Sequence, residues 1–383
     1  MAASPLQVAA MSSALVLAKA AIMSPELARC VAEQPGALPA LVAAVAAGGA
    51  PAIKGLQIPA VISMIALGDI TKAPELARRV AEEPGALRAL VATLAAGSAA
   101  AAFNLQDKAV NSAAAPSDIT EAPVLARRVA EEPGALCALI VALADGGAAI
   151  ATSILLDKAA NSAVVLRNMA SASPDLLQRI AEEPGALPAL VAAVAAACAA
   201  GAPCRLQGAA ANGVVVLGTI ASATRELAQR VVDVPGALPA LVAAMAAGSA
   251  AAETRLQDVA INSANALADI ASASPGLAQR VAEARGALPA ILATAAAGGS
   301  AAGPAGRAVA AIRSWALAAV AAAGGACGHC GRRAVSATGE RLRVCAGCNT
   351  ARYCSAECQR HAWGSHKAAC RAIAATSGGN EGA

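Results

Sequence analysis

The chain has 383 residues, of which 57% are hydrophobic and 14% charged, with a formal net charge of +4. This composition excludes a mainly disordered protein, because apolar residues are plentiful and charges are few. Only four residues are aromatic, namely Phe103, Trp315, Tyr353 and Trp363. A core with so few rings must be filled by Ala, Leu, Val and Ile, and Ala favours helices over strands. The composition therefore predicts a nearly all-α protein.

The longest uncharged segments, such as 184–204 and 286–306, consist mostly of Ala and Gly and are interrupted by Pro. They lack the Leu, Ile and Phe density of a membrane-spanning helix. The first 25 residues contain one basic residue, Lys19, which is poorly placed for a secretory signal peptide. We therefore expect no membrane association and a cytoplasmic or nuclear location. The same 25 residues also lack acids, so an organelle-transit segment is the alternative.

A Pro-Gly-Ala-Leu motif recurs along the chain at nearly equal intervals. Its glycines are spaced by 49, 49, 51, 51 and 50 residues, counting a last copy in which Arg285 replaces the proline. Self-similarity at such a period is the signature of a repeat protein. The glycines are Gly36, Gly85, Gly134, Gly185, Gly236 and Gly286.

The sequence pattern of each repeat predicts three helices. The first begins at a Pro, often after a Ser such as Ser274, since Ser caps helices well and Pro suits the first helical position. A Pro-Gly pair, as at 84–85, ends it at a sharp corner. A second helix follows, as at 237–247, and then a longer third helix, roughly 252–270. Pro116 interrupts one third helix and predicts a kink there.

Asn and Asp side chains gather on one side of the third helix. At 100° per residue, Asp258, Asn262, Asn265 and Asp269 lie within about 60° of one another. Stacked repeats would carry a ladder of such residues, which is either a binding groove or a solvated helix face. The candidate groove residues are Asp69, Asn111, Asp118, Asn161, Asn168, Asn212, Asn262, Asp269 and Trp315.

The repeats resemble armadillo repeats over residues 5–322. Residues 236–242 match the opening of that family's second helix, and residues 266–271 match the end of its third helix, where the family commonly has Asn. The resemblance implies an α-solenoid whose third helices line a concave groove for extended peptides. The groove Trp of nuclear-import receptors has a counterpart only in Trp315, which argues against an import-receptor role.

Seven of the eleven cysteines and all three histidines lie between residues 327 and 370, after a Gly-Gly pair at 324–325. Partners separated by two or three residues are typical of zinc ligands, and eight ligands make two tetrahedral sites. A disulfide framework is disfavoured by the odd number of cysteines. The candidate ligands are Cys327, Cys330, Cys345, Cys348, Cys354, Cys358, His366 and Cys370.

This C-terminal pattern resembles the MYND-type zinc finger, and all eight ligand positions match. Spacing alone leaves interleaved and sequential pairing open. The resemblance implies interleaved sites, with residues 327, 330, 354 and 358 on one zinc and 345, 348, 366 and 370 on the other. It also implies a module that binds short proline-containing peptides through Ser355, Gln359 and Trp363. We expect the finger at 327–370 and a flexible tail at 371–383.

The sequence favours a protein-interaction adaptor rather than an enzyme. Protein ligands fill both zinc sites, which leaves no open position for water activation. The alternative is a nucleic-acid-associated transcriptional regulator, because eight Lys/Arg against three Glu follow residue 326. Zinc bound to seven thiolates lowers that charge to about +2, so we expect protein or peptide partners. The scattered cysteines are expected to be small buried side chains: Cys30, Cys137, Cys198 and Cys204.

Overall fold

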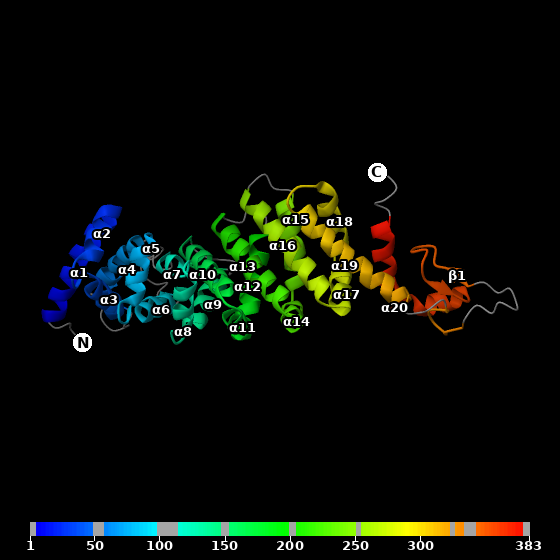
Figure 1. Cartoon of the computed structure of the whole chain (residues 1–383), viewed down its shortest axis with the longest axis horizontal. Coiled ribbons are helices and arrows are strands. Elements are labelled where there is room, and N and C mark those ends of the chain that lie inside the picture. Colours follow the sequence, from blue (N-terminus) through cyan, green and yellow to red (C-terminus); the bar gives the residue numbers. More distant parts are fainter. Residues whose placement is uncertain are drawn as a thin grey trace. The chain divides into compact units, whose positions relative to one another are not determined.

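A computed structural model describes residues 5–48, 57–97, 114–146, 153–198, 204–249, 254–321, 326–332 and 342–377. The described chain is almost entirely helical, with one small antiparallel sheet near its C-terminus (Figure 1). It divides into two compact units, Met1–Ile220 and Ala221–Ala383. The predicted all-α fold class is confirmed.

Each repeat begins with a short amphipathic helix of nine residues. The residue before four of these helices is Ser or Thr, and its hydroxyl accepts a backbone hydrogen bond; Ser173 accepts from the N–H of Leu176 at 3.3 Å. The predicted cap and proline start are therefore confirmed. These helices are α2 (Pro25–Glu33), α5 (Pro74–Glu82), α8 (Pro123–Glu131), α11 (Pro174–Glu182), α14 (Arg225–Asp233) and α17 (Pro275–Glu283).

A left-handed glycine turns the chain from the first to the second helix of every repeat. The six glycines have φ between 77° and 85°, a region that residues with a side chain avoid. Gly286 keeps this conformation although Arg285 replaces the proline, so the glycine sets the corner. The second helices are α3 (Ala37–Gly48), α6 (Ala86–Gly97), α9 (Ala135–Gly146), α12 (Ala186–Ala197), α15 (Ala237–Ser249) and α18 (Ala287–Ala297).

The third helices are the longest elements of most repeats. Pro116 lies in the first turn of α7, and the residues before Ala114 are outside the described part, so the predicted kink stays a prediction. The third helices, with the partial first repeat included, are α1 (Pro5–Met23), α4 (Gln57–Thr71), α7 (Ala114–Ile119), α10 (Ser153–Ala172), α13 (Cys204–Ala223), α16 (Thr254–Ala273) and α19 (Ala302–Ala321).

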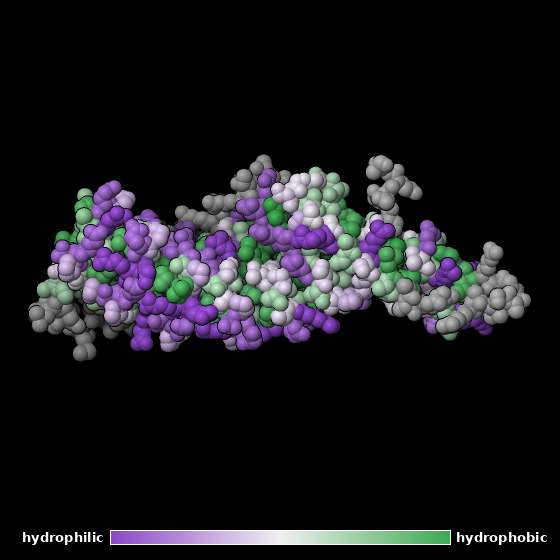
Figure 2. Space-filling model, viewed as in Figure 1, coloured by the Kyte–Doolittle hydropathy of each residue, from purple (hydrophilic) through white to green (hydrophobic). Residues whose placement is uncertain are grey.

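Equivalent helices of successive repeats pack on one another. In unit 1 the second helices α3, α6, α9 and α12 contact in series, as do the third helices α4, α7 and α10. In unit 2 helix α15 contacts α18, and α16 contacts α19. Most of the buried side chains of the repeats are Ala, Leu, Val and Ile, as predicted. Hydrophilic side chains gather over the first helices α8 and α11 of unit 1 (Figure 2).

Among the residues that the structure describes, one helix segment, Leu206–Ala223, is long and apolar enough to cross a membrane by length and composition. Within the folded chain, 61% of this segment is buried. Three pairs of first and second helices pass the same test when each pair counts as one span, but they bend by 85° to 98° at the glycine corner. Their apolar side chains belong to the interior of the repeats, where hydrophobic residues face neighbouring helices.

The C-terminal elements are β1 (Arg343–Val344), β2 (Arg352–Tyr353) and α20 (Ala356–Ser377), and β1 and β2 pair antiparallel. Helix α20 contacts α19 and α17 within unit 2. The predicted flexible tail from residue 371 is wrong for residues 371–377, because α20 continues through them with Ala372 and Ile373 buried. Residues 378–383 lie outside the described part.

Candidate functional site

Two groups of four ligand side chains lie in the C-terminal module. Within each group the candidate ligand atoms are all within 4.8 Å of one another. The pairing is interleaved, which the ligand spacing alone left open. One group joins the first knuckle to the start of α20, and the other joins the second knuckle to the middle of α20. The groups are Cys327, Cys330, Cys354 and Cys358, and Cys345, Cys348, His366 and Cys370.

The distances between ligand atoms fit tetrahedral zinc. A zinc–sulfur bond of about 2.3 Å places two ligand sulfurs of a tetrahedron about 3.8 Å apart. The sulfur–sulfur distances are 3.6 Å between Cys330 and Cys354 and 3.8 Å between Cys345 and Cys370. These distances are far too long for disulfides, whose sulfurs are about 2 Å apart. The ten described cysteines are all free, in agreement with metal sites rather than a disulfide framework.

Each Cys-x-x-Cys knuckle turns through a residue with positive φ directly after its second cysteine. These residues are Gly331, with φ 71°, and Asn349, with φ 51°. Gly347 lies inside the second knuckle, and a Cβ atom there would come within 2.9 Å of the Cys370 sulfur. The small residue thus lets a ligand from α20 approach the knuckle.

Two of the three residues predicted to contact a peptide also support the zinc sites, and their peptide contact stays a prediction. Ser355 caps α20, since its hydroxyl accepts a hydrogen bond from the N–H of Cys358 at 3.1 Å. The Gln359 amide donates to the Cys345 sulfur at 3.6 Å, an outer contact that orients a ligand. The third residue, Trp363, is 41% exposed.

His366 lies between two aromatic rings. The buried Tyr353 ring approaches it edge-on with centroids 5.8 Å apart, and the Trp363 ring does so at 6.0 Å. Trp363 therefore has one side on a ligand and the other open to solvent. The two histidines outside the ligand set, His329 and His361, are exposed and stack on each other.

The protonation state of each ligand depends on that of its neighbours. Burial raises the pKa of Cys327, but backbone hydrogen bonds outweigh it and lower the pKa to about 6. Hydrogen bonding to neighbouring sulfurs, Cys358 first, raises the pKa of Cys354 to about 12, and burial with nearby sulfurs does the same for Cys370. Neighbouring thiolates thus suppress one another's ionisation, and a divalent cation removes that penalty. Burial lowers the pKa of His366, which favours the neutral, metal-binding imidazole.

In unit 1 the predicted ladder forms hydrogen bonds between successive repeats. The Thr71 hydroxyl donates to the Asp118 carboxylate at 3.2 Å, and the Asn168 amide donates to the Thr120 hydroxyl at 3.2 Å. Asp69, Asp118 and Asn168 are equivalent ladder positions of successive repeats. Asp118 and Asn168 each bond to a threonine of the preceding repeat, Thr71 or Thr120, which lies two positions after the ladder residue of that repeat. The ladder therefore stabilises the stacking of these repeats.

The chain's own cations also contact the ladder. Lys72 donates to Asp69 at 2.6 Å, and Arg167 donates to Asn212 at 2.8 Å and to Asn168 at 3.0 Å. In unit 2, Asp269, Asn262 and Trp315 are partly buried, as Asn161 is in unit 1. Asn111 lies outside the described residues.

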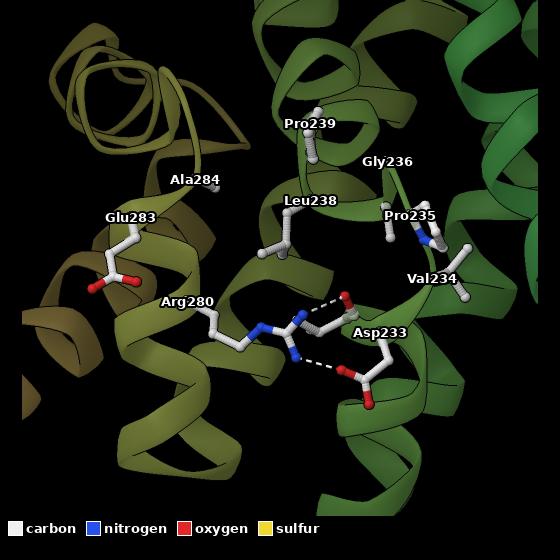
Figure 3. Close-up of a pocket in the computed structure, with 11 residues that line it drawn as sticks. Asp233, Val234, Pro235, Gly236, Leu238, Pro239, Arg280, Glu283 and Ala284 are labelled. Atoms are coloured by element: carbon white, nitrogen blue, oxygen red, sulfur yellow. Dashed lines mark hydrogen bonds and ion pairs between the residues drawn. The ribbon is translucent and has the colours of Figure 1, made fainter.

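A cavity of about 380 Å³ opens between the α14–α15 corner and α17 (Figure 3). The Arg280 guanidinium crosses it, donating to the Val232 carbonyl at 3.0 Å and to the Asp233 carboxylate. In unit 1, Arg179 at the equivalent position donates to the Ala130 carbonyl at 2.8 Å. This arginine satisfies a free carbonyl at the end of the preceding first helix, so the cavity is a notch between stacked repeats.

The scattered cysteines differ from the expectation. Cys30 and Cys137 are exposed rather than buried, because each lies on the outer side of its helix. Cys198 is partly buried, and the side chain of Cys204 is outside the described part.

Comparison with known families agrees with the C-terminal geometry. Residues 327–370 match the MYND finger family. The match spans all eight ligands, so this module is a MYND-type zinc finger with two zinc ions. No curated protein sequence matches the chain at a significant level.

The helical repeats have the armadillo fold, as predicted. A computationally designed armadillo repeat protein for modular peptide recognition is similar with a TM-score of 0.54 and 23% identity, over 72% of this chain and 99% of that one. A designed armadillo repeat protein in complex with the peptide (KR)4 has a TM-score of 0.53 and 24% identity over the same shares. At such identities the likeness establishes the fold of the repeats.

We predict that native mass spectrometry under reducing conditions shows two zinc ions per chain. Cys330→Ser should lower the zinc count, because it opens one tetrad, whereas Cys137→Ser, an exposed cysteine of the repeats, should leave two. A strong chelator should also unfold the start of α20, seen as faster hydrogen exchange there. Unchanged exchange in metal-free protein would show that the module folds without zinc.

A second prediction concerns Asp118, whose pKa is raised mainly by burial. The folded state favours the protonated form of this carboxyl. The resulting stability is fully present below the unfolded pKa of about 4 and is lost as the pH rises through the raised folded pKa, where the buried carboxyl ionises. Asp118→Asn keeps an acceptor for Thr71 and should stabilise the repeats at pH 7 by up to about 0.5 kcal/mol, a value discounted for partial exposure. Near pH 3 the gain should vanish in urea unfolding followed by circular dichroism. Asp69→Asn, which loses the Lys72 ion pair, is the control and should gain nothing.

Proposed function

We propose that the protein is an adaptor, in which the zinc finger binds a proline-containing peptide and the third-helix surface binds an extended segment of another protein. The observation that carries this proposal is the combination of two metal sites, each with four protein ligands, and an exposed Trp363. Zinc ions whose four positions are taken by protein ligands hold structure and leave no site for chemistry. An exposed indole fixed on a rigid helix is a typical anchor for a peptide.

Trp363 is the residue of the finger best placed to contact a peptide. Ser355 and Gln359 already have partners in the helix cap and on Cys345, whereas the Trp363 ring is 41% exposed. A flat aromatic ring suits the rigid face of proline, whose ring loses little conformational entropy on binding.

The proposal for the repeats rests on the ladder and on the fold. A designed protein of the same fold was solved with the cationic peptide (KR)4. Here Asp69 offers a carboxylate with 21% side-chain exposure, and Lys72, in the turn directly after the same helix, already pairs with it. A cationic segment on this surface must therefore compete with the chain's own lysine.

We also propose a cytoplasmic or nuclear location. The seven ligand thiols and the exposed Cys30 and Cys137 are compatible with a reducing compartment, where thiols stay free for metal binding.

We predict that Trp363→Ala weakens binding of a proline-containing peptide at least tenfold while both zinc ions remain. Peptides would be found on an array of proline-containing decapeptides, and affinity would be measured by calorimetry. A loss of about 1.4 kcal/mol or more is common for a buried aromatic anchor. Trp315→Ala, in α19, is the matched control and should leave finger binding unchanged. Loss of zinc in Trp363→Ala would make the residue structural.

A further prediction tests the third-helix surface with labelled (KR)4 peptide at low ionic strength. Lys72→Ala frees the Asp69 carboxylate and should raise affinity about two- to threefold, the strength of an exposed ion pair. Arg78→Ala is the control, because it removes the same charge from an ion pair with Glu82 on the first helix α5. Equal gains in both variants would show a general charge effect and contradict binding along the third helices.

A further inference from the structure

Basic side chains and one tryptophan share the outer face of α20. At 100° per residue, Arg360, Trp363, Lys367 and Arg371 lie within about 80° of one another on the helix. All four side chains are exposed, and the zinc ligands of the same helix point outside this window. We call these four residues the basic stripe.

The cations of the basic stripe are free of ion pairs within the part of the chain that the structure describes. The described finger residues, 326–332 and 342–377, contain six Lys/Arg and a single acid, Glu357. The zinc–thiolate groups carry negative charge. At 100° per residue, Cys358 lies about 140° from the nearest stripe residue, and Cys370 lies beside Trp363 but about 60° or more from the cations. Glu357, three residues before Arg360, is exposed on the same side. The exposed face of α20 therefore carries three cations against one acid around an apolar ring, and this net positive charge attracts an anionic partner.

The spacing along the helix suggests how a peptide fits. Arg360 and Lys367 are about 10.5 Å apart along the axis, at 1.5 Å per residue, with Trp363 between them. An extended peptide advances about 3.3 Å per residue, so the two cations are separated by about three peptide residues. The two residues that flank a Pro-Pro pair are three positions apart, so a Pro-Pro pair on Trp363 would have one flanking residue near each cation.

We propose that the basic stripe recognises proline-containing peptides that carry an acidic side chain on each side of a Pro-Pro pair. This inference rests on the proposed peptide-binding function of the finger and specifies its substrate class. A peptide is favoured over a nucleic acid, because the stripe offers a single ring for stacking and single-strand binders use several. The net charge of the zinc-loaded finger is also small, about +2 over its described residues.

The experiment compares three decapeptides with a central Pro-Pro flanked by Glu, Gln or Lys. The probe is Trp363 fluorescence in full-length, zinc-loaded Trp315→Phe protein, since the chain has only two tryptophans. We expect the Glu peptide to bind about tenfold tighter than the Gln peptide at low ionic strength, and the advantage to shrink with salt. The Lys peptide should bind most weakly.

Charge-reversal variants distinguish binding at the basic stripe from a general effect of the net charge of the protein. Arg360→Glu with Lys367→Glu should abolish the preference for the Glu peptide, with two zinc ions retained. Arg332→Glu with Arg343→Glu changes net charge equally at exposed positions outside α20 and should preserve it. If the double stripe reversal loses zinc, Arg360→Gln with Lys367→Gln replaces it and should also remove the preference.

The outcomes distinguish the two proposals. Equal binding of the Glu and Gln peptides, unchanged by stripe reversal, overturns the acidic specificity and leaves proline-peptide binding standing. Absence of binding by all three peptides overturns both. A single-stranded oligonucleotide that binds more tightly than the Glu peptide, through the same stripe residues, overturns the inference in favour of nucleic acid.

Discussion

Metal coordination fixes the position of α20, and the C-terminal module depends on that helix. The start of α20 supplies Cys358 to one tetrad, and its middle supplies His366 and Cys370 to the other. Its last turns bury Ala372 and Ile373, and the helix contacts α19. A module with so few large apolar side chains cannot hold a 22-residue helix by packing alone, so two metal sites along one helix set both its axial position and its rotation. That rotation places the ligands inward and Trp363 outward.

The repeats replace aromatic packing by close approach of helices. Ser162 and Ser263 lie at the same position of their third helices, and both are fully buried with no hydrogen-bond partner among the described residues. Gly213 takes that position in α13, where an added Cβ would meet Leu190 and Val194 at 3.6 Å. Neighbouring side chains thus surround this position at ordinary contact distance, and dense Ala, Leu and Val contacts offset the cost of the unpartnered hydroxyl.

Features that recur or have strict chemical spacing were predictable from the sequence. The corner glycines such as Gly236 carry a backbone requirement, and the ligand pairs carry a coordination requirement, so both are visible without a structure. Contacts between repeats were not, because the bond from Thr71 to Asp118 depends on how two repeats are offset when they stack. The extent of α20 was missed for the same reason: Ala372 and Ile373 show their role only against the last repeat.

The charge of the two proposed binding surfaces argues for two different partners. The ladder presents carboxylates and amides, partly satisfied by Lys72 and Arg167, and therefore favours cationic or neutral extended segments. The outer face of α20 presents Arg360, Lys367 and Arg371 and favours acidic ones. A segment whose charge suits one surface has the same sign of charge as the other surface and is repelled by it. Such repulsion discriminates strongly between partners. Opposite charge preferences on one chain thus suit a protein that joins two unlike partners rather than one that binds the same segment twice.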